Sequence, residues 1–398
     1  MTKNDNNELL TRGISAIYPS KDFLNSKILK GEKLTLYLGI DPTGPTLHLG
    51  HAIALKKLSE FQKAGHKIIL LMGDFTAMIG DPTDKSAARK QLTHKEVMLN
   101  LKNYKKQASK LISFTGKNKA EFKFNSKWLN KMNFSDVLNL ASKMTVQQML
   151  ERDMFKKRIE EGKPIFIHEF MYPLMQGYDS VAMDVDGELG GNDQIFNMLC
   201  GRDLMKTIKN KEKFVVAVKL LEDNNGKKMG KSEGNMVALS DTPEEMYGNV
   251  MSWNDSLIIS GFELCTNISM IEIEKISKII KLESTNLKDL KMRLAIEITT
   301  IFHGENKAKE AQTNWEKIFS KKEIPTDIEN ISIKKGTLLV DVFLDKKIIS
   351  SKSDFRRLVE EGAVTNLDTD KKVDNYNEVS ENGVYRIGKK RFCKITIK

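Results

Sequence analysis

Hydrophobic positions in the first half of the chain follow two spacings in turn, one typical of strands and the other of helices. Residues 33–40 (KLTLYLGI) and 67–72 (KIILLM) are short apolar runs of the kind that form buried strands. Between them, residues 48–64 carry apolar side chains at helical spacing, and Gly65 stands where a helix commonly ends. With a Pro/Gly turn at 41–45, this pattern predicts a βα unit.

The same alternation continues along the chain. It predicts a lysine-rich polar helix up to about residue 112, helices over 169–184 and 194–208, a short strand and turn at 188–193, and a strand at 213–221. Strands that alternate with helices indicate a mostly parallel sheet covered by helices. We therefore expect an α/β fold for this part of the chain.

The pattern changes after a polar, glycine-containing stretch at residues 224–235. Asp241–Glu245 (DTPEE) marks a helix start, because it joins a capping residue, a proline in the first turn and acidic residues. The spacing then stays helical to about Phe319, and residues 323–330 are expected to form a linker. The tail predicts two short helices, at 338–344 and 352–361, then a turn at Gly362 and short strands that end at 391–398.

Composition restricts the class of protein. The chain has 398 residues, 40% hydrophobic and 29% charged, which fits a folded protein of several domains and excludes wholesale disorder. The longest apolar run, near residues 68–72, is far shorter than the ~20 residues that span a bilayer, and residues 1–11 lack the apolar core of a signal peptide. We therefore expect a cytoplasmic protein. Cys200, Cys265 and Cys393 are widely spaced, which disfavours disulfides or a cysteine-built zinc site.

The charge balance suggests an anionic partner. Lysine and arginine number 64 against 53 aspartates and glutamates, a net charge of +11. Residues 331–398 contain 15 basic and 10 acidic residues, so 15 − 10 = +5 of this excess lies in the tail. The tail is where we expect nucleic acid to bind. The base composition of the genome is an alternative source of the excess of lysine.

Two histidines open the helix predicted at residues 48–64. In His48-Leu49-Gly50-His51, the two imidazoles are three residues apart and so share one face of a helical turn. Gly50 would let a ligand approach the backbone, and the start of a helix favours anions. The motif indicates phosphate binding. A structural histidine pair is the general alternative, and a metal site is disfavoured because no third ligand lies nearby in the sequence.

A second motif, Lys228-Met229-Gly230-Lys231-Ser232, follows the strand predicted at 213–221. Two lysines in a polar loop can neutralise a triphosphate and the charge that develops in its transition state. Residues 226–232 read G-x-x-x-G-K-S, one residue shorter than a P-loop, which disfavours an ordinary P-loop ATPase. A solvated basic loop is the alternative.

Together the two motifs resemble the HIGH and KMSKS signatures of class I aminoacyl-tRNA synthetases. Four further segments are similar to the bacterial-type tyrosyl-tRNA synthetases, and they are Tyr37–Thr43 (YLGIDPT), Gly80–Pro82 (GDP), Tyr172–Asp179 (YPLMQGYD) and Glu188–Gln194 (ELGGNDQ). Glu188 departs from one branch of the family, which has glutamine there. From Lys335 the tail, with residues 351–358 (SKSDFRRL), is similar to an RNA-binding domain named after a small-subunit ribosomal protein.

The resemblance implies three domains. Residues 1–235 would form a Rossmann-like parallel-sheet catalytic domain, and residues 236–330 an all-helical domain on the anticodon side. Residues 331–398 would form a small α+β RNA-binding domain. The resemblance also implies a homodimer.

The resemblance implies a role for each site residue as well. Tyr37 and Asp179 would bind the phenolic hydroxyl of tyrosine, Asp81, Tyr172 and Gln176 its ammonium group, and Gln194 would lie near its carboxylate. This set suits its ligand, because carboxylates and neutral acceptors bind a cation. ATP would contact Asp41, Gly50, Gly191, Asp193 and Lys231. Its phosphates and the departing pyrophosphate would be surrounded by Thr43, His48, His51, Lys85, Arg89, Lys228 and Lys231. Magnesium would arrive with ATP, without a protein ligand.

The implied activity is that of a tyrosine–tRNA ligase. The tyrosine carboxylate, ionised at pH 7, would attack the α-phosphate of ATP, and the resulting adenylate would pass tyrosine to the 3′ end of tRNA(Tyr). Three alternatives stay open. A tryptophan enzyme has no reason to keep Tyr37 with Asp179, and a small nucleotidylyltransferase does not need the helical segment at 241–319. A non-catalytic RNA-binding paralogue would be expected to lose the histidines and lysines.

Overall fold

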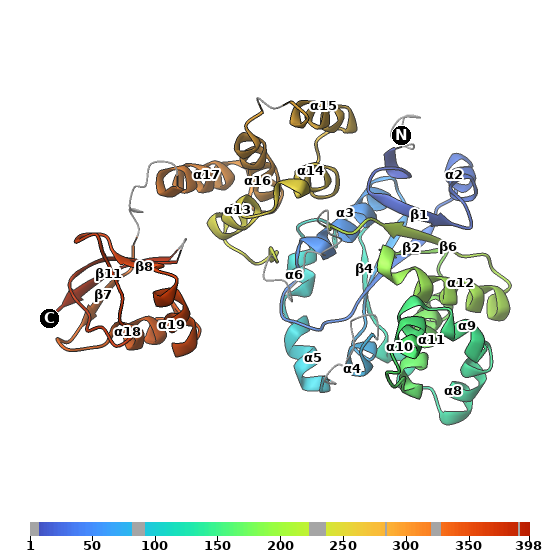
Figure 1. The fold of residues 1–398 in the computed structure, drawn as a ribbon. Coiled ribbons are helices and arrows are strands. Elements are labelled where there is room, and N and C mark those ends of the chain that lie inside the picture. Colours follow the sequence, from blue (N-terminus) through green and yellow to red (C-terminus); the bar gives the residue numbers. More distant parts are fainter. Residues whose placement is uncertain (1–7, 82–91, 223–235, 283–284, 320–327, 389–390) are drawn as a thin grey trace. The chain divides into compact units, whose positions relative to one another are not determined.

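The chain forms two compact units, Met1–Gln312 and Thr313–Lys398, each with its own β-sheet (Figure 1). The structure, a computed structural model, describes residues 8–81, 92–222, 236–282, 285–319, 328–388 and 391–398. The three-domain division with boundaries at residues 235 and 330 stays a prediction.

The first unit is built on a six-stranded sheet in the order β1-β6-β5-β2-β3-β4. Its strands are β1 (Ile14–Tyr18), β2 (Thr35–Ile40), β3 (Lys67–Met72), β4 (Glu121–Phe124), β5 (Gly187–Gly191) and β6 (Phe214–Val218). Strands β2 to β6 run parallel, and β1 pairs antiparallel with β6. The predicted Rossmann-like parallel sheet is therefore confirmed. The strand order reverses between β2 and β5, and ligands of open α/β sheets bind at the carboxyl ends of the strands beside such a reversal.

Helices connect these strands. They are α2 (Lys21–Leu29), α3 (Leu49–Lys63), α4 (Thr76–Ile79), α5 (His94–Leu101), α6 (Tyr104–Ala108), α7 (Ser126–Leu129), α8 (Phe134–Ala141), α9 (Val146–Leu150), α10 (Asp153–Glu160), α11 (Ile167–Met183) and α12 (Ile195–Lys209). The predicted long polar helix is wrong in its described part, where two short helices, α5 and α6, replace it. The break has a tertiary reason, because Tyr104 at the start of α6 is buried and its hydroxyl donates to Gly44 O (2.6 Å).

The described part of the following segment is helical, as predicted. Helices α13 (Pro243–Met251), α14 (Ile258–Cys265), α15 (Met270–Ile280) and α16 (Leu287–His303) belong to the first unit, and the division between the two units, after Gln312, falls within α17 (Glu305–Phe319). Thr242 caps α13 and Glu245 closes its capping box, in agreement with the sequence signal. Arg12 joins this segment to the start of the chain. Its buried guanidinium donates to the main-chain oxygens of Thr266 and Ile268 (both 2.7 Å), which follow the C-terminus of α14.

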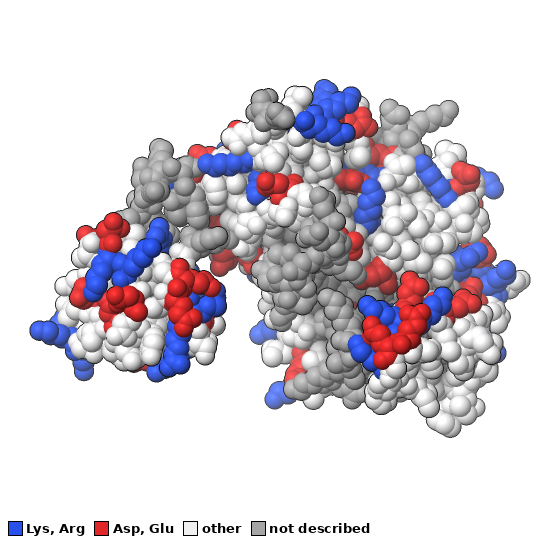
Figure 2. Space-filling model, viewed as in Figure 1, with Lys and Arg blue, Asp and Glu red and all other residues white. Residues whose placement is uncertain are grey.

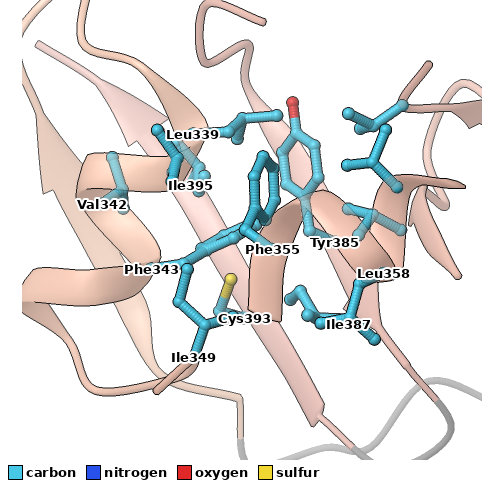
Figure 3. Packing of buried hydrophobic residues seen from close by; sticks show 14 of the residues in the cluster. Leu339, Val342, Phe343, Ile349, Phe355, Leu358, Tyr385, Ile387, Cys393 and Ile395 are labelled. Carbon is cyan, nitrogen blue, oxygen red and sulfur yellow. The ribbon is translucent and has the colours of Figure 1, made fainter. Parts of the chain in front are cut away.

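The second unit has a five-stranded sheet in the order β7-β11-β10-β8-β9. The strands are β7 (Asn330–Ile333), β8 (Val364–Asn366), β9 (Lys371–Lys372), β10 (Gly383–Ile387) and β11 (Arg391–Ile397), with helices α18 (Leu339–Asp345) and α19 (Lys352–Glu360). Phe343, Phe355 and Tyr385 meet at the centre of its core (Figure 3). The sequence predicted both helices and the final strand but not β7, which begins at the last residue of the expected linker.

Candidate functional site

Polar residues gather at the carboxyl ends of the parallel strands beside the β2/β5 reversal. Asp41 follows β2, Gly73 follows β3, Asn125 follows β4 and Gly191 ends β5. Helix α11 brings Tyr172, Gln176 and Asp179 to the same region, as the contacts below show. Residues that the sequence placed in four separate segments thus meet at one edge of the sheet.

Asp41 is held by two hydroxyl groups. Tyr172 donates to its Oδ2 (2.8 Å) and Thr76 to its Oδ1 (2.7 Å). Burial raises the pKa of Tyr172 well above its usual value, and the charge of Asp41 adds to the shift, so the phenol keeps its proton. A Cβ on Gly73 would lie 1.8 Å from Asp41 Oδ1. Only glycine therefore leaves room for this carboxylate.

Asp179 is buried, with a donor on each carboxylate oxygen. Trp128 Nε1 donates to Oδ1 (2.7 Å) and Asn125 Nδ2 to Oδ2 (3.2 Å). Burial raises the pKa of Asp179 well above its usual value, and the bonds from Trp128 and Asn125 oppose that rise. Sequence reasoning missed both donors, because it recognised neither β4, which Asn125 follows, nor α7, which carries Trp128.

Tyr37 lies fully buried in β2, beside Asp179. Its hydroxyl is 3.0 Å from the Oγ of Ser180, the residue that follows Asp179 on α11. Burial raises the pKa of Tyr37 well above its usual value, and the negative charges of Glu188 and Asp179 add to the effect. Tyr37 is therefore a neutral hydrogen-bonding group, and it lies close to the carboxylate with which the sequence paired it.

Asp81, Gln176 and Gln194 belong to one hydrogen-bonded chain. Gln194 Nε2 donates to Asp81 Oδ2 (2.9 Å), while Asn197 Nδ2 donates to the side-chain oxygens of both Gln176 (2.9 Å) and Gln194 (3.0 Å). Arg152 also contacts Asp81, at 2.8 Å from Oδ1. Arg152 and Asn197 were not among the predicted site residues, since no motif marked them.

A buried ion pair lies next to this chain. Lys213, which immediately precedes β6, contacts Glu188 of β5, and their side chains are 0% and 2% exposed. Burial lowers the pKa of Lys213, and Glu188 opposes that shift. Gln176 Nε2 donates to the other oxygen of Glu188 (3.0 Å). The predicted residue Gln176 is therefore joined to a charge pair that the sequence did not reveal.

The two histidines sit together at the start of α3. His48 caps the helix and its Nδ1 accepts from Gly50 N (3.1 Å), while His51 Nδ1 accepts from His48 N (3.2 Å). Their ring centroids are 4.0 Å apart. Because each Nδ1 accepts, the neutral rings carry their protons on Nε2. Burial lowers the pKa of His48 to about 4 and that of His51 to about 3, with His48 adding to the second shift.

Gly50 leaves room for the His48 ring, and its expected contact with ATP stays a prediction. A Cβ at this position would lie 2.9 Å from the His48 ring. A side chain at position 50 would therefore displace the His48 imidazole.

The second motif, Lys228–Ser232, lies outside the described residues, as do Lys85 and Arg89. The chain that follows it is described and is fastened to the histidine motif. Leu49 N donates to Val237 O (3.0 Å), and Leu239 N donates to Leu47 O (2.8 Å). The C-terminal flank of the second motif therefore runs beside the first motif.

The remaining predicted ATP contacts lie at the surface. Gly191 ends β5, and a Cβ there would be 2.5 Å from Asp193 Oδ1, so the Asp193 side chain folds back over the strand end. Asp193 and Thr43 are exposed to solvent. Within the described ranges, no three His, Cys, Asp or Glu side chains are arranged to hold a metal ion. The individual roles of the site residues stay predictions.

The second unit carries charges of both signs on its surface. Figure 2 shows lysine and arginine side chains interspersed with acidic ones on its visible face. On α19, Arg357 pairs with Asp354 and Glu361 (both 2.9 Å), while the Arg356 guanidinium lies 4.8 Å from the ring centre of Tyr376. The excess of positive charge in the tail is thus partly compensated locally.

Comparisons with known proteins agree on one family. The family model described as tRNA synthetases class I (W and Y) matches residues 29–320. The tyrosine–tRNA ligase of Thermotoga maritima is 44% identical over 100% of this chain and 98% of its own length. Tyrosine–tRNA ligase 2 of Clostridium acetobutylicum is 42% identical over 98% of each chain.

A solved structure supports the fold. The C-terminally truncated mitochondrial tyrosyl-tRNA synthetase of Aspergillus nidulans superposes with a TM-score of 0.67 at 23% identity, over 80% of this chain and 95% of that one.

We predict that both site histidines stay neutral over the physiological pH range. Because burial lowers the pKa of His48 to about 4 and of His51 to about 3, neither ring should take up a proton between pH 8 and pH 6. Nitrogen NMR of the imidazoles should show the Nε2–H tautomer throughout, with His48→Gln and His51→Gln used to assign the signals. A titration midpoint near 6.5 for either ring would contradict this prediction.

Proposed function

Because this chain belongs to the class I aminoacyl-tRNA synthetases of the tryptophan and tyrosine group, we propose that it is a tyrosine–tRNA ligase whose described site activates L-tyrosine with ATP. The observation that carries tyrosine over tryptophan is the buried phenol site. Tyr37 offers a neutral hydroxyl and Asp179 a carboxylate held by two donors. A phenolic O–H can donate to such a carboxylate and accept from a hydroxyl, whereas an indole N–H can only donate.

In the proposed first step, the tyrosine carboxylate attacks the α-phosphorus of ATP and pyrophosphate leaves. The carboxylate is already ionised at pH 7, so no general base is required. Catalysis then consists of positioning and of stabilising the charge that develops on the phosphates. His48 and His51 would contribute through their Nε2–H groups as neutral donors, since their low pKa values keep them uncharged.

The amino-acid end of the site suits an ammonium group. Asp81 supplies negative charge, while Tyr172 and Gln176 supply neutral oxygen acceptors. Arg152 contacts Asp81 at 2.8 Å, so this carboxylate is fixed in place by an ion pair on one of its oxygens. Gln194, bonded to the other oxygen, would lie towards the substrate carboxylate.

In the proposed second step, the adenylate passes its tyrosyl group to the 3′ end of tRNA(Tyr). We assign the second unit to tRNA binding, on the basis of its net charge and the exposed Arg356–Tyr376 stack, which resembles surfaces that hold phosphates and bases. ATP would enter with Mg²⁺ bound mainly to its phosphate oxygens.

We place the reaction in the cytoplasm. Three cysteines are buried as free thiols, which fits a reducing compartment. In the described part of the chain, no helix is long and apolar enough to cross a membrane.

We infer that helices α8 to α11 contribute to a homodimer interface. Large apolar side chains are exposed there, and they are Phe134, Leu138, Val146, Ile159, Phe166 and Ile167. The helices are neighbours, since α8 contacts α11 and α9 contacts α10 (Figure 1). Exposed apolar side chains gathered on adjacent elements indicate a protein interface more often than a free surface.

ATP–pyrophosphate exchange should proceed with tyrosine alone among the amino acids. Asp179→Asn should lower kcat/KM for tyrosine about 10- to 100-fold, because a hydrogen bond to a charged group contributes about 1.5–3 kcal/mol. Asp184→Asn, an exposed carboxylate at the end of the same helix, is the matched control and should leave exchange unchanged. Exchange with tryptophan would assign the chain to the sister enzyme, and exchange with no amino acid would favour a non-catalytic paralogue.

Deletion of residues 335–398 should spare tyrosine activation and weaken tRNA charging. The deleted segment belongs to a separate compact unit. Because this segment is proposed to contact tRNA phosphates, charging by the full chain should weaken as the salt concentration rises from 50 to 200 mM. Exchange and aminoacylation would be measured on both chains. Equal loss of the two activities would overturn this division of roles.

The variant Ile167→Glu should shift the protein from dimer to monomer. Ile167 is 82% exposed at the start of α11, so a glutamate there should cost little free energy in the separate chain. In the dimer the same glutamate would be buried at the interface, at a cost of several kcal/mol. Light scattering after size exclusion would give the mass. Ile271→Glu, at a 70% exposed position on α15, is the control and should not change it. A monomeric wild-type protein would refute the interface.

A further inference from the structure

A buried asparagine joins two glutamines of the predicted amino-acid site. Asn197 is fully buried on α12, and its Nδ2 donates to the side-chain oxygens of Gln176 (2.9 Å) and Gln194 (3.0 Å). Its own Oδ1 has no hydrogen-bond partner among the described residues. Asn197 therefore acts in this network through its amino group alone.

Carboxylates at the two outer ends decide how both glutamines are turned. Gln176 Nε2 donates to Glu188 Oε1 (3.0 Å), and Gln194 Nε2 donates to Asp81 Oδ2 (2.9 Å). An ionised carboxylate can only accept, so each glutamine must turn its NH₂ outwards and its oxygen towards Asn197. The orientation of the three side-chain amides, those of Gln176, Asn197 and Gln194, therefore depends on the ionisation of the two end carboxylates.

Each end carboxylate has its own cation. Arg152 contacts Asp81, and Lys213 contacts Glu188. Lys213 Nζ also donates to Ser180 Oγ (2.9 Å), and a Cβ on Gly201 would lie only 2.6 Å from Nζ. The ammonium group is therefore enclosed on the side of α12 and bonded on the side of α11. Without Lys213, Glu188 would be an unpaired buried carboxylate, and such a group takes up a proton rather than stay charged.

A protonated Glu188 would offer Gln176 a hydrogen-bond donor in place of an acceptor. Its hydroxyl could donate to the Gln176 oxygen, and the glutamine could then turn its NH₂ group towards the site. An NH₂ group repels an ammonium ion, whereas an amide oxygen with a lone pair left over accepts from it. The difference between the two orientations is therefore a difference in affinity for the amino group of the substrate.

We propose that Lys213, acting through Glu188, is a positioning residue that keeps the Gln176 side-chain oxygen available to the ammonium group of the bound amino acid. Asn197 holds the same amide from the opposite end. This inference rests on the proposed function, because it assumes that the site binds an amino acid and that Gln176 faces its ammonium group.

The test compares tyrosine with 3-(4-hydroxyphenyl)propionate, which is tyrosine without its amino group. Binding of each would be measured by calorimetry at pH 6 and pH 8.5. In Lys213→Met, tyrosine affinity should fall about tenfold or more at pH 6 and improve at pH 8.5 as Glu188 ionises, while affinity for the analogue should change less than twofold. Lys211→Met, which removes the partly exposed ion pair between Lys211 and Asp186, should behave as the wild type.

The double variant Lys213→Met/Glu188→Gln separates this effect from other titrations. The ionisable groups around the pair are Tyr37 on β2, Asp179 on α11, and Cys200 and Asp203 on α12. All four remain in both variants, so only the single variant should show the additional pH dependence. A pH dependence of equal size in the double variant would assign it to one of these groups and overturn the proposal.

Asn197→Asp provides a second measurement that does not require Lys213→Met to fold. The change keeps the size of the side chain but places an acceptor against two amide oxygens. Tyrosine affinity should again fall about tenfold or more, with a smaller effect on the analogue. Equal losses for both ligands, or no loss for either, would overturn the proposal. If the wild type does not prefer tyrosine to the analogue, the proposed function itself fails, and the inference with it.

Discussion

Burial of negative charge is the constraint on which this site depends. Asp179 and Glu188 are buried, Asp41 is partly buried in the same region of the first unit, and each costs free energy unless donors or a cation compensate it. The structure supplies a separate solution in each case. Two hydroxyls hold Asp41, an indole and an amide hold Asp179, and Lys213 pairs with Glu188. Much of the local packing follows from placing these partners.

The sheet and three glycines make that placement possible. The reversal of strand order between β2 and β5 opens the edge at which the polar groups meet. Gly73 leaves room for the Asp41 carboxylate and Gly201 for the Lys213 ammonium group. At Gly187, a Cβ would lie 2.1 Å from an atom of the Phe214 ring. A methyl group at any of these positions would displace a neighbour, so backbone and charge network constrain each other.

Elements with a clear apolar pattern could be predicted from the sequence, whereas the short strands β1, β4 and β7 could not. Strand β3 and helices α3, α11 and α12 have strong periodicity, and their bounds agree with the prediction to within two residues. Strand β4 has only four residues, and β1 is an edge strand that pairs only with β6, so neither has a distinctive pattern of apolar positions. Motifs marked the residues that are proposed to face the substrates. Trp128, Asn197 and Lys213 carried no signal because their roles arise from contacts between elements distant in the sequence.

The uncharged state of His48 and His51 has a consequence for turnover. In the proposed reaction, pyrophosphate must leave after each activation, and a product with several negative charges would be slow to leave a site that contacts it only through cations. Neutral N–H groups interact with an oxyanion at contact distance, where geometry matters, and attract it little once it moves away. This half of the site can therefore favour the transition state without retaining the product.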